Sequence, residues 1–190
     1  MVSMIAALAT ASWAAVHAVA PLISDLPLYM DKFVELVRYA AWIFFLLTTY
    51  SSRVEEADHP LTSLRWIPWY VIGVMFVVVV LVALPSLRLV FTFSEIFNQY
   101  ATHMIWLVLS LLGLVLVEQI YRNSPETELP SIKYTCLGLG FLFAYDFFMY
   151  AEAVAVQQVD EVLWQARGAA IAVTALLLCL LYTSPSPRDA

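Results

Sequence analysis

The chain has 190 residues, of which 63% are hydrophobic and only 13% are charged. A soluble domain of this length needs far more charge on its surface, so the composition excludes that class. Its net charge of −6 offers no basic footprint for nucleic acid. The apolar runs are long and do not alternate with polar residues, which indicates spanning helices rather than a membrane barrel. The sequence therefore predicts an all-α, polytopic transmembrane helical bundle in contact with a lipid bilayer.

Six apolar stretches are long enough to cross the ~30 Å hydrocarbon layer as helices. Prolines and charged residues lie in the connections between them, where they end or cap helices. We expect the first stretch to be a retained span rather than a cleaved signal peptide, because no Lys or Arg precedes it. The expected spans lie near residues 2–20, 32–50, 66–87, 102–121, 133–155 and 165–181.

The Lys and Arg residues of the short connections predict the orientation of the spans. The connections after the second and fourth spans hold Arg53, Arg65, Arg122 and Lys133. Those after the first, third and fifth spans hold Lys32, Arg88 and Arg167. The excess of four over three predicts that both ends of the segment lie in the cytoplasm.

The expected fifth span carries ionisable residues where a plain anchor would carry Leu. Asp146 and Glu152 both lie inside the apolar stretch from Lys133 to Ala155. An ionisable residue at membrane depth is costly, so two interpretations stand: paired acids within a packed helix, or a direct sensing or ligand role. The candidate polar cluster consists of Asp146, Tyr145, Tyr150, Glu152, Arg167 and, as a further counter-charge, Arg38.

The two arginines of this cluster have alternative positions. Arg38 lies three residues after Glu35 on one helical face, so the two can pair locally. Alternatively, Arg38 extends to the membrane interface or reaches a buried acid on another span. Arg167 either joins the cluster or lies at the interface as a cap at the start of the sixth span.

Small residues of the fifth span share about 100° of the helix surface. Such a stripe lets two helix backbones approach closely in lipid, so we expect these residues to pack helices. The stripe consists of Cys136, Gly140, Ala144, Ala151 and Ala155. Cys136 and Cys179 both lie in apolar runs, which favours small packing residues over a disulfide or a metal pair.

The sequence carries no catalytic motif. Patterns of the P-loop, H-E-x-x-H, G-x-S-x-G and C-x-x-C kinds are all missing. His17, His59 and His103 are scattered along the chain, and none has a metal-ligating partner at the usual spacing. We therefore expect no catalytic residue, no metal site and no cofactor in these residues.

Three motifs occur together between Glu118 and Gly168. The chain reads EQIYRNSP, then KYTCLGLGFLFAYDFFMYAEA, and then DEVLWQARG. This combination closely resembles the membrane region of the PEP-CTERM/exosortase-associated sensor histidine kinases of PrsK type. The strong resemblance covers about a quarter of the chain, with a looser similarity at 11–15 and 36–47. The matching residues are Glu118, Gln119, Tyr121, Arg122, Asn123, Pro125, Lys133, Cys136, Leu137, Gly138, Gly140, Phe143, Ala144, Tyr145, Asp146, Tyr150, Ala151, Ala153, Asp160, Leu163, Trp164, Ala166, Arg167 and Gly168.

The resemblance implies a multi-span sensor region followed by a cytoplasmic phosphoacceptor helix pair and an ATP-binding domain. It also implies a homodimer formed through those cytoplasmic parts, a bacterial inner-membrane location, and a response regulator that controls exopolysaccharide and PEP-CTERM protein-sorting genes. None of the kinase parts lies in these 190 residues. On this interpretation the segment is the signal-input module of a histidine protein kinase.

The alternative is a stand-alone transporter subunit or membrane enzyme. In that case Asp146 and Glu152 would line a path for protons or a polar substrate. The apolar segments show no obvious repeat and no paired broken helices, which are typical of many transporters. The sensor interpretation is therefore preferred.

The end of the chain has an unusual sequence. Residues 179–190 read CLLYTSPSPRDA, which resembles translated sequencing-adapter read-through at the end of a metagenomic reading frame. We expect the membrane sensor region to occupy 1–178 and the natural chain to continue past it with other residues. Met1 is likewise not taken as the native start.

Overall fold

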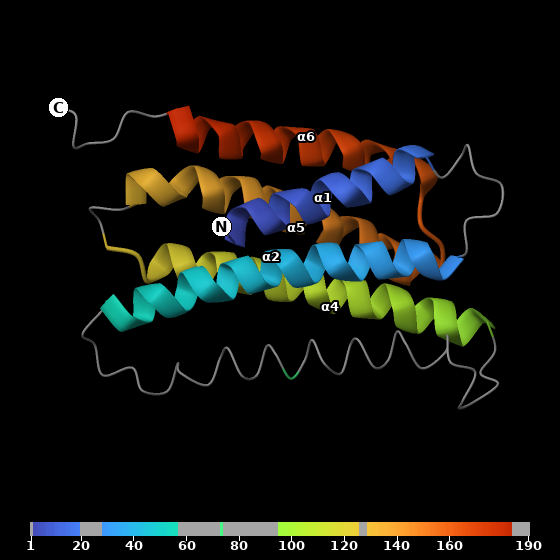
Figure 1. The fold of residues 1–190 in the computed structure, drawn as a ribbon. Coiled ribbons are helices and arrows are strands. Elements are labelled where there is room, and N and C mark those ends of the chain that lie inside the picture. Colours follow the sequence, from blue (N-terminus) through green and yellow to red (C-terminus); the bar gives the residue numbers. More distant parts are fainter. Residues whose placement is uncertain (1, 20–27, 57–72, 74–94, 126–128, 184–190) are drawn as a thin grey trace. The chain divides into compact units, whose positions relative to one another are not determined.

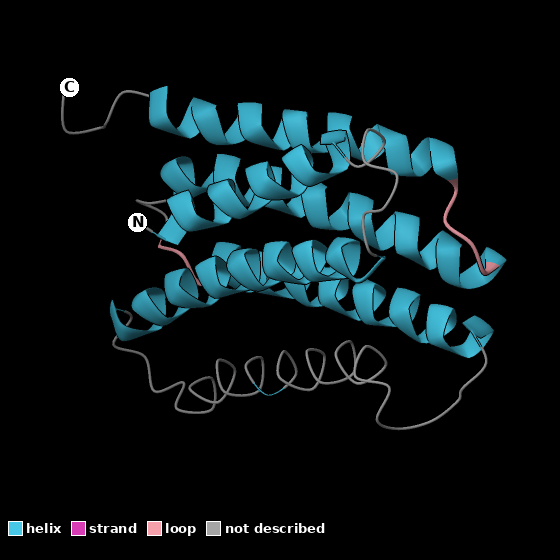
Figure 2. Cartoon of the chain, turned by 45° about the vertical axis from the view of Figure 1, so that its right-hand side comes forward, coloured by secondary structure: helices cyan, strands magenta, loops and turns pink. Residues whose placement is uncertain are grey.

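The computed structural model describes residues 2–19, 28–56, 73, 95–125 and 129–183. All regular secondary structure in these residues is helical, as Figure 2 shows. The helices are α1 (Val2–Val19), α2 (Leu28–Glu56), α4 (Glu95–Arg122), α5 (Leu129–Val156) and α6 (Glu161–Thr183). The expected all-helical class is thus confirmed for the described part of the chain.

Four of these helices are long and apolar enough to cross a membrane. The stretches are Lys32–Tyr50 in α2, Tyr100–Arg122 in α4, Ile132–Val156 in α5 and Glu161–Leu178 in α6. They coincide with four of the six expected spans and indicate a membrane protein. The first expected span forms α1, which is not among the four, and the expected span 66–87 lies outside the described residues apart from the helical Gly73.

The described helices fall into two compact units, Met1–Asn98 and Gln99–Ala190. In the first unit, α1 and α2 form an antiparallel hairpin (Figure 1). Trp13 of α1 contacts Glu35 of α2, and Thr10, earlier in α1, contacts Trp42, later in α2. The residue numbers thus fall along α1 as they rise along α2, as in an antiparallel pair. The α2 residues that are buried recur at helical spacing, so one face of α2 forms the core of this unit.

The second unit consists of three consecutive antiparallel helices, with α5 in contact with both of the others (Figure 1). Trp106 of α4 lies beside Tyr150 of α5, with ring centroids 6.5 Å apart. The other side of α5 packs against α6, whose Thr174 hydroxyl lies 3.2 Å from the Gly138 carbonyl oxygen. A short turn that includes Gln157 (φ 64°) joins α5 to α6, and Asp160 caps α6 by accepting hydrogen bonds from the Val162 and Leu163 amides.

Glycines set the helix spacing in the second unit. A Cβ atom on Gly113 of α4 would lie 2.6 Å from the Phe143 ring of α5, so the ring fills the space that the glycine leaves. A Cβ atom on Gly138 of α5 would lie 3.3 Å from Leu177 and 3.4 Å from the Thr174 carbonyl of α6. Without these two glycines the backbones could not approach as closely, which is the usual role of small residues between membrane helices.

Candidate functional site

A buried ion pair joins α5 to α6. Arg167 Nε donates a hydrogen bond to Asp146 Oδ1 over 2.8 Å. Both side chains have a relative exposure of 0%. Since the two residues lie 21 positions apart in the chain, the pair depends on the antiparallel packing of the two helices.

The pair lies near the middle of both apolar stretches. Asp146 is two residues from Ala144, the midpoint of Ile132–Val156. Arg167 is about three residues from the midpoint of Glu161–Leu178. At 1.5 Å of rise per residue, Asp146 lies about 15 Å from the end of α5 and Arg167 about 9 Å from the start of α6.

Aromatic rings surround the guanidinium. Its central carbon lies 5.6 Å from the Tyr150 ring centroid and 5.1 Å from the Trp164 ring centroid. At these distances the negative face of each ring attracts the cation. Tyr145 adds a second link between the helices, because its hydroxyl donates a hydrogen bond to the Leu163 carbonyl over 2.5 Å. We call Tyr145, Asp146, Tyr150, Trp164 and Arg167 the α5–α6 cluster.

The free-energy cost of an unpaired buried charge determines how the α5–α6 cluster constrains the two helices. An isolated charge at the centre of a membrane costs several kcal/mol, and pairing removes much of that cost. A buried pair need not stabilise the fold relative to apolar residues, but removing one partner leaves a bare charge and costs about 3–5 kcal/mol. The cluster therefore fixes α6 against α5 in one register, and any motion that separates the two charges is costly.

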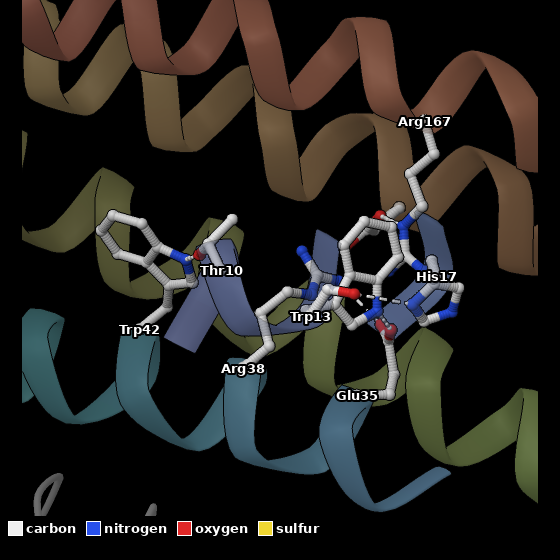
Figure 3. A network of polar contacts seen from close by, with 8 residues as sticks. Thr10, Trp13, His17, Glu35, Arg38, Trp42 and Arg167 are labelled. Atoms are coloured by element: carbon white, nitrogen blue, oxygen red, sulfur yellow. Dashed lines mark hydrogen bonds and ion pairs between the residues drawn. The ribbon is translucent and has the colours of Figure 1, made fainter. Parts of the chain in front are cut away.

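The first unit contains a second buried pair. In α2, Arg38 Nη2 donates to Glu35 Oε1 over 2.7 Å, and both residues are buried. Trp13 of α1 donates its indole N–H to Glu35 Oε2 over 2.6 Å (Figure 3). The Arg38 guanidinium carbon lies 5.3 Å from the Trp13 ring centroid and 4.9 Å from that of Tyr39. We call Trp13, Glu35, Arg38 and Tyr39 the α1–α2 cluster.

Both clusters use the same chemistry. In each, an arginine is paired with one carboxylate and lies near one Trp ring and one Tyr ring. The planar guanidinium suits this role because it is less strongly hydrated than an ammonium group and stacks on aromatic faces. Each hairpin thus holds one neutralised pair of charges between its two helices.

The structure brings together most of the residues that the sequence marks as a polar cluster. Tyr145, Asp146, Tyr150 and Arg167 lie in the α5–α6 cluster, and Arg167 is fully buried against α5. Glu152 lies in the last turn of α5 and is partly exposed. Arg38 lies in the first unit, where it forms the predicted local pair with Glu35 on α2.

The stripe of small residues lies mainly on the α4 side and the outer side of α5. A Cβ atom on Gly140 would meet Val117 of α4 at 3.7 Å. Cys136, a free cysteine, and Ala151 are partly exposed, whereas Ala144 and Ala155 are exposed. The close approach to α6 occurs instead at Gly138, which lies outside the stripe.

Several residues of the two sites are not evident in the sequence. Trp13 and Thr174 make contacts with partners 22 and 36 residues away, which no local pattern predicts. The contact between Trp164 and Arg167 could be predicted from the sequence, because the two residues lie three positions apart, within one helical turn. Glu35 and Arg38 have the spacing of a local pair, which the structure contains, but nothing in the sequence marks that pair as buried.

Among the described residues, no group of three or more His, Cys, Asp and Glu side chains could hold a metal ion. The acids of the two clusters are each engaged with an arginine.

Comparisons of the chain with protein-family models, with curated proteins and with solved structures give no match in any of the three.

Proposed function

We propose that this chain is the membrane-embedded signal-input region of a two-component sensor histidine kinase. The observation that carries the proposal is the composition of the α5–α6 cluster. Every one of its residues belongs to the motifs that resemble PrsK-type kinases: Tyr145, Asp146 and Tyr150 to the second motif, and Trp164 and Arg167 to the third. Asp146 and Arg167 lie 21 residues apart in sequence, yet their side chains meet in one ion pair.

In this proposal the α5–α6 hairpin is the element that responds to the signal. A stimulus acts only if it favours one of two packing arrangements over the other. The buried pair supplies such a preference, because arrangements that keep Asp146 beside Arg167 avoid a bare charge at membrane depth. A shift of the hairpin would pass along α6 to the domains that follow it.

The wider setting follows from the family resemblance and the charge bias, and it belongs to the same proposal. The parent protein is a homodimer in the bacterial inner membrane, with both ends of this segment in the cytoplasm. Its phosphoacceptor and ATP-binding domains act on a response regulator for exopolysaccharide and PEP-CTERM protein-sorting genes. The four long apolar helices are consistent with a lipid bilayer as a partner.

The transporter or membrane-enzyme alternative has less support. A carboxylate that carries protons has to alternate between its charged and neutral forms. Each protonation of Asp146 would leave Arg167, which stays charged at any physiological pH, without its counter-charge in a buried site. Glu152 lies in the last turn of α5, away from the middle of the span, so it does not extend Asp146 into a path.

Recovery of the source DNA beyond the codon for Leu178 tests the proposal. We expect the reading frame to continue into a helical segment with a phosphoacceptor His and then an ATP-binding domain. A frame that stops soon after α6 would eliminate the kinase proposal. Uptake assays in vesicles with wild type and Asp146→Asn would then test the transporter alternative.

We predict that Asp146→Asn changes the autophosphorylation rate of that longer protein in membranes without preventing insertion. The amide keeps the shape of the carboxylate but leaves Arg167 without its negative partner. Glu118→Gln is the matched control, because it removes a carboxylate from an exposed pair with Arg122 on α4. Equal autophosphorylation rates for Asp146→Asn and wild type would exclude a signalling role for Asp146.

A further inference from the structure

A chain of contacts runs from the end of α1 to the α1–α2 cluster. His17, in the last turn of α1, lies against Trp13, with ring centroids 4.2 Å apart and an interplanar angle of 30°. Trp13 in turn donates its indole N–H to Glu35, which is paired with Arg38. Figure 3 shows these four side chains together, with His17 at the outer end of the chain of contacts.

The hydrogen bonding of His17 decides which of its nitrogens takes up a proton. Nδ1 lies 2.9 Å from the backbone carbonyl oxygen of Trp13. A carbonyl oxygen only accepts hydrogen bonds, so Nδ1 carries the hydrogen of the neutral ring. Nε2 is then the basic nitrogen, and its protonation would place a positive charge on a ring that lies against Trp13.

Charged and titratable groups of α1 and α2 surround the contact between His17 and Trp13. His17 is the only one on α1. On α2, the packed partner of α1, Glu35 and Arg38 are buried beside Trp13, and the Tyr39 ring lies against Arg38. Lys32, one turn before Glu35, is the next charge on α2 and is partly exposed.

We propose that His17 is a proton-sensing site whose protonation changes how α1 packs on α2. A positive imidazolium attracts the Glu35 carboxylate and repels the Arg38 guanidinium, which remains charged at any physiological pH. It therefore competes with Arg38 for Glu35, whose two oxygens are divided between Trp13 and Arg38. Because Glu35 also accepts the Trp13 indole N–H of α1, a pull of the imidazolium on Glu35 changes the polar contact between α1 and α2.

This inference rests on the proposed function, because it names the proton as a stimulus for the same membrane region. The expected orientation places the end of α1 on the side of the membrane away from the cytoplasm. Imidazole is the side chain that ordinarily titrates between about pH 5 and pH 8. The site would thus report acidification of the cell envelope to the helices.

A distance measurement between α1 and α2 tests the inference. Spin labels at Leu8→Cys and Phe44→Cys, two exposed positions on these helices, would be placed in a chain with Cys136 and Cys179 replaced by Ala. We expect the mean distance in lipid vesicles to differ by about 1–2 Å between pH 8 and pH 5, the usual size of a helix shift. The transition should have its midpoint in the imidazole range.

Three variants identify the residue responsible. His17→Gln should keep the pH 8 distance at both pH values, and His17→Lys, which is always charged, should keep the pH 5 distance. His103→Gln, which changes a histidine of α4, should retain the wild-type response. An unchanged wild-type distance, or a shift that persists in His17→Gln, would overturn the inference. If His17→Gln fails to insert, a His17→Lys distance equal to that of wild type at pH 8 would overturn it instead.

The distance measurement between α1 and α2 needs no kinase domain. A negative result for the proton response is therefore distinguishable from a negative result for the kinase proposal. A reading frame without a kinase would leave a measured proton response intact. A missing response would leave the kinase proposal standing with a different stimulus.

Discussion

The buried charged residues of the described helices lie in two pairs, which makes their burial tolerable. Asp146 and Arg167 share a 2.8 Å hydrogen bond, and Glu35 and Arg38 share one of 2.7 Å. The exposed pair of Glu118 and Arg122 differs, since its atoms are 3.3 Å apart and its side chains are 60% and 70% exposed. Such a surface pair contributes about 0–1 kcal/mol, whereas loss of one buried partner costs several times more.

Tyr145 makes the second polar link of the α5–α6 cluster, and we predict a modest cost for its removal. Tyr145→Phe leaves the ring in place but removes the hydrogen bond to the Leu163 carbonyl. The expected loss is about 1 kcal/mol in the free energy of unfolding, measured by denaturant titration in mixed micelles. Tyr121→Phe, at an exposed position near the end of α4, is the control. Equal stabilities of the two variants would show that the Tyr145 hydroxyl does not contribute.

At the scale of helices, Gly113 of α4 and the Phe143 ring of α5 form a close contact between the two helices. We predict that Gly113→Ala destabilises the second unit by about 1–3 kcal/mol, because the new methyl group would meet Phe143 at 2.6 Å. Gly168→Ala is the matched control, since nothing lies within 4 Å of its added Cβ atom. Phe143→Leu should restore part of the stability lost in Gly113→Ala. Thermal unfolding of the four proteins in detergent measures the difference.

An equal loss in Gly113→Ala and Gly168→Ala would contradict this contact. The loss would then come from a general effect of Ala on these helices rather than from the Phe143 ring. The absence of any rescue by Phe143→Leu would lead to the same conclusion.

The helices themselves follow directly from the sequence. Apolar stretches of about 20 residues fix both the type and the approximate bounds of the helices in the described part of the chain, because only helices satisfy their own backbone hydrogen bonds in lipid. The observed helices are longer than the expected spans: α4 begins at Glu95 and α2 extends to Glu56. Hydropathy does not predict these polar extensions, since helical turns outside the membrane need no apolar side chains.

The faces of the helices are harder to predict than their bounds. In a membrane, the residues facing lipid and the residues facing protein are both apolar, so the amphipathic signal of a soluble helix is weak. The contact with α6 involves Gly138 and Thr174, which no such signal marks in the sequence. Asp146 was predictable as a special residue because a charge stands out against an apolar background.

Pairing between distant residues was only partly predictable. Asp146 and Arg167 could be grouped because few charges lie within the apolar spans, so the choice of partners is small. The link from Trp13 to Glu35 could not be foreseen, because Trp serves equally well at interfaces, in lipid and in a polar cluster. Its role depends on the register of the α1–α2 hairpin, which only the three-dimensional structure provides.

At the scale of the whole molecule, the described helices form two compact units, and neighbouring helices within each unit are antiparallel. Each unit holds one hairpin that buries an arginine, a carboxylate and two aromatic rings between its helices. In the proposed sensor, these hairpins would be stable in one register and would respond to a change in a few charges. The six-span topology and the cytoplasmic position of both ends remain predictions of the sequence.

The most direct test of this view is a double-mutant cycle on Asp146 and Arg167, measured as the free energy of unfolding in mixed micelles. We expect Asp146→Asn and Arg167→Gln each to cost about 3–5 kcal/mol, because each leaves one buried charge without its partner. The double variant should cost clearly less than the sum of the two, since it leaves no bare charge. Additive costs, or costs below about 1 kcal/mol like those of an exposed pair, would contradict a buried ion pair as the link between α5 and α6.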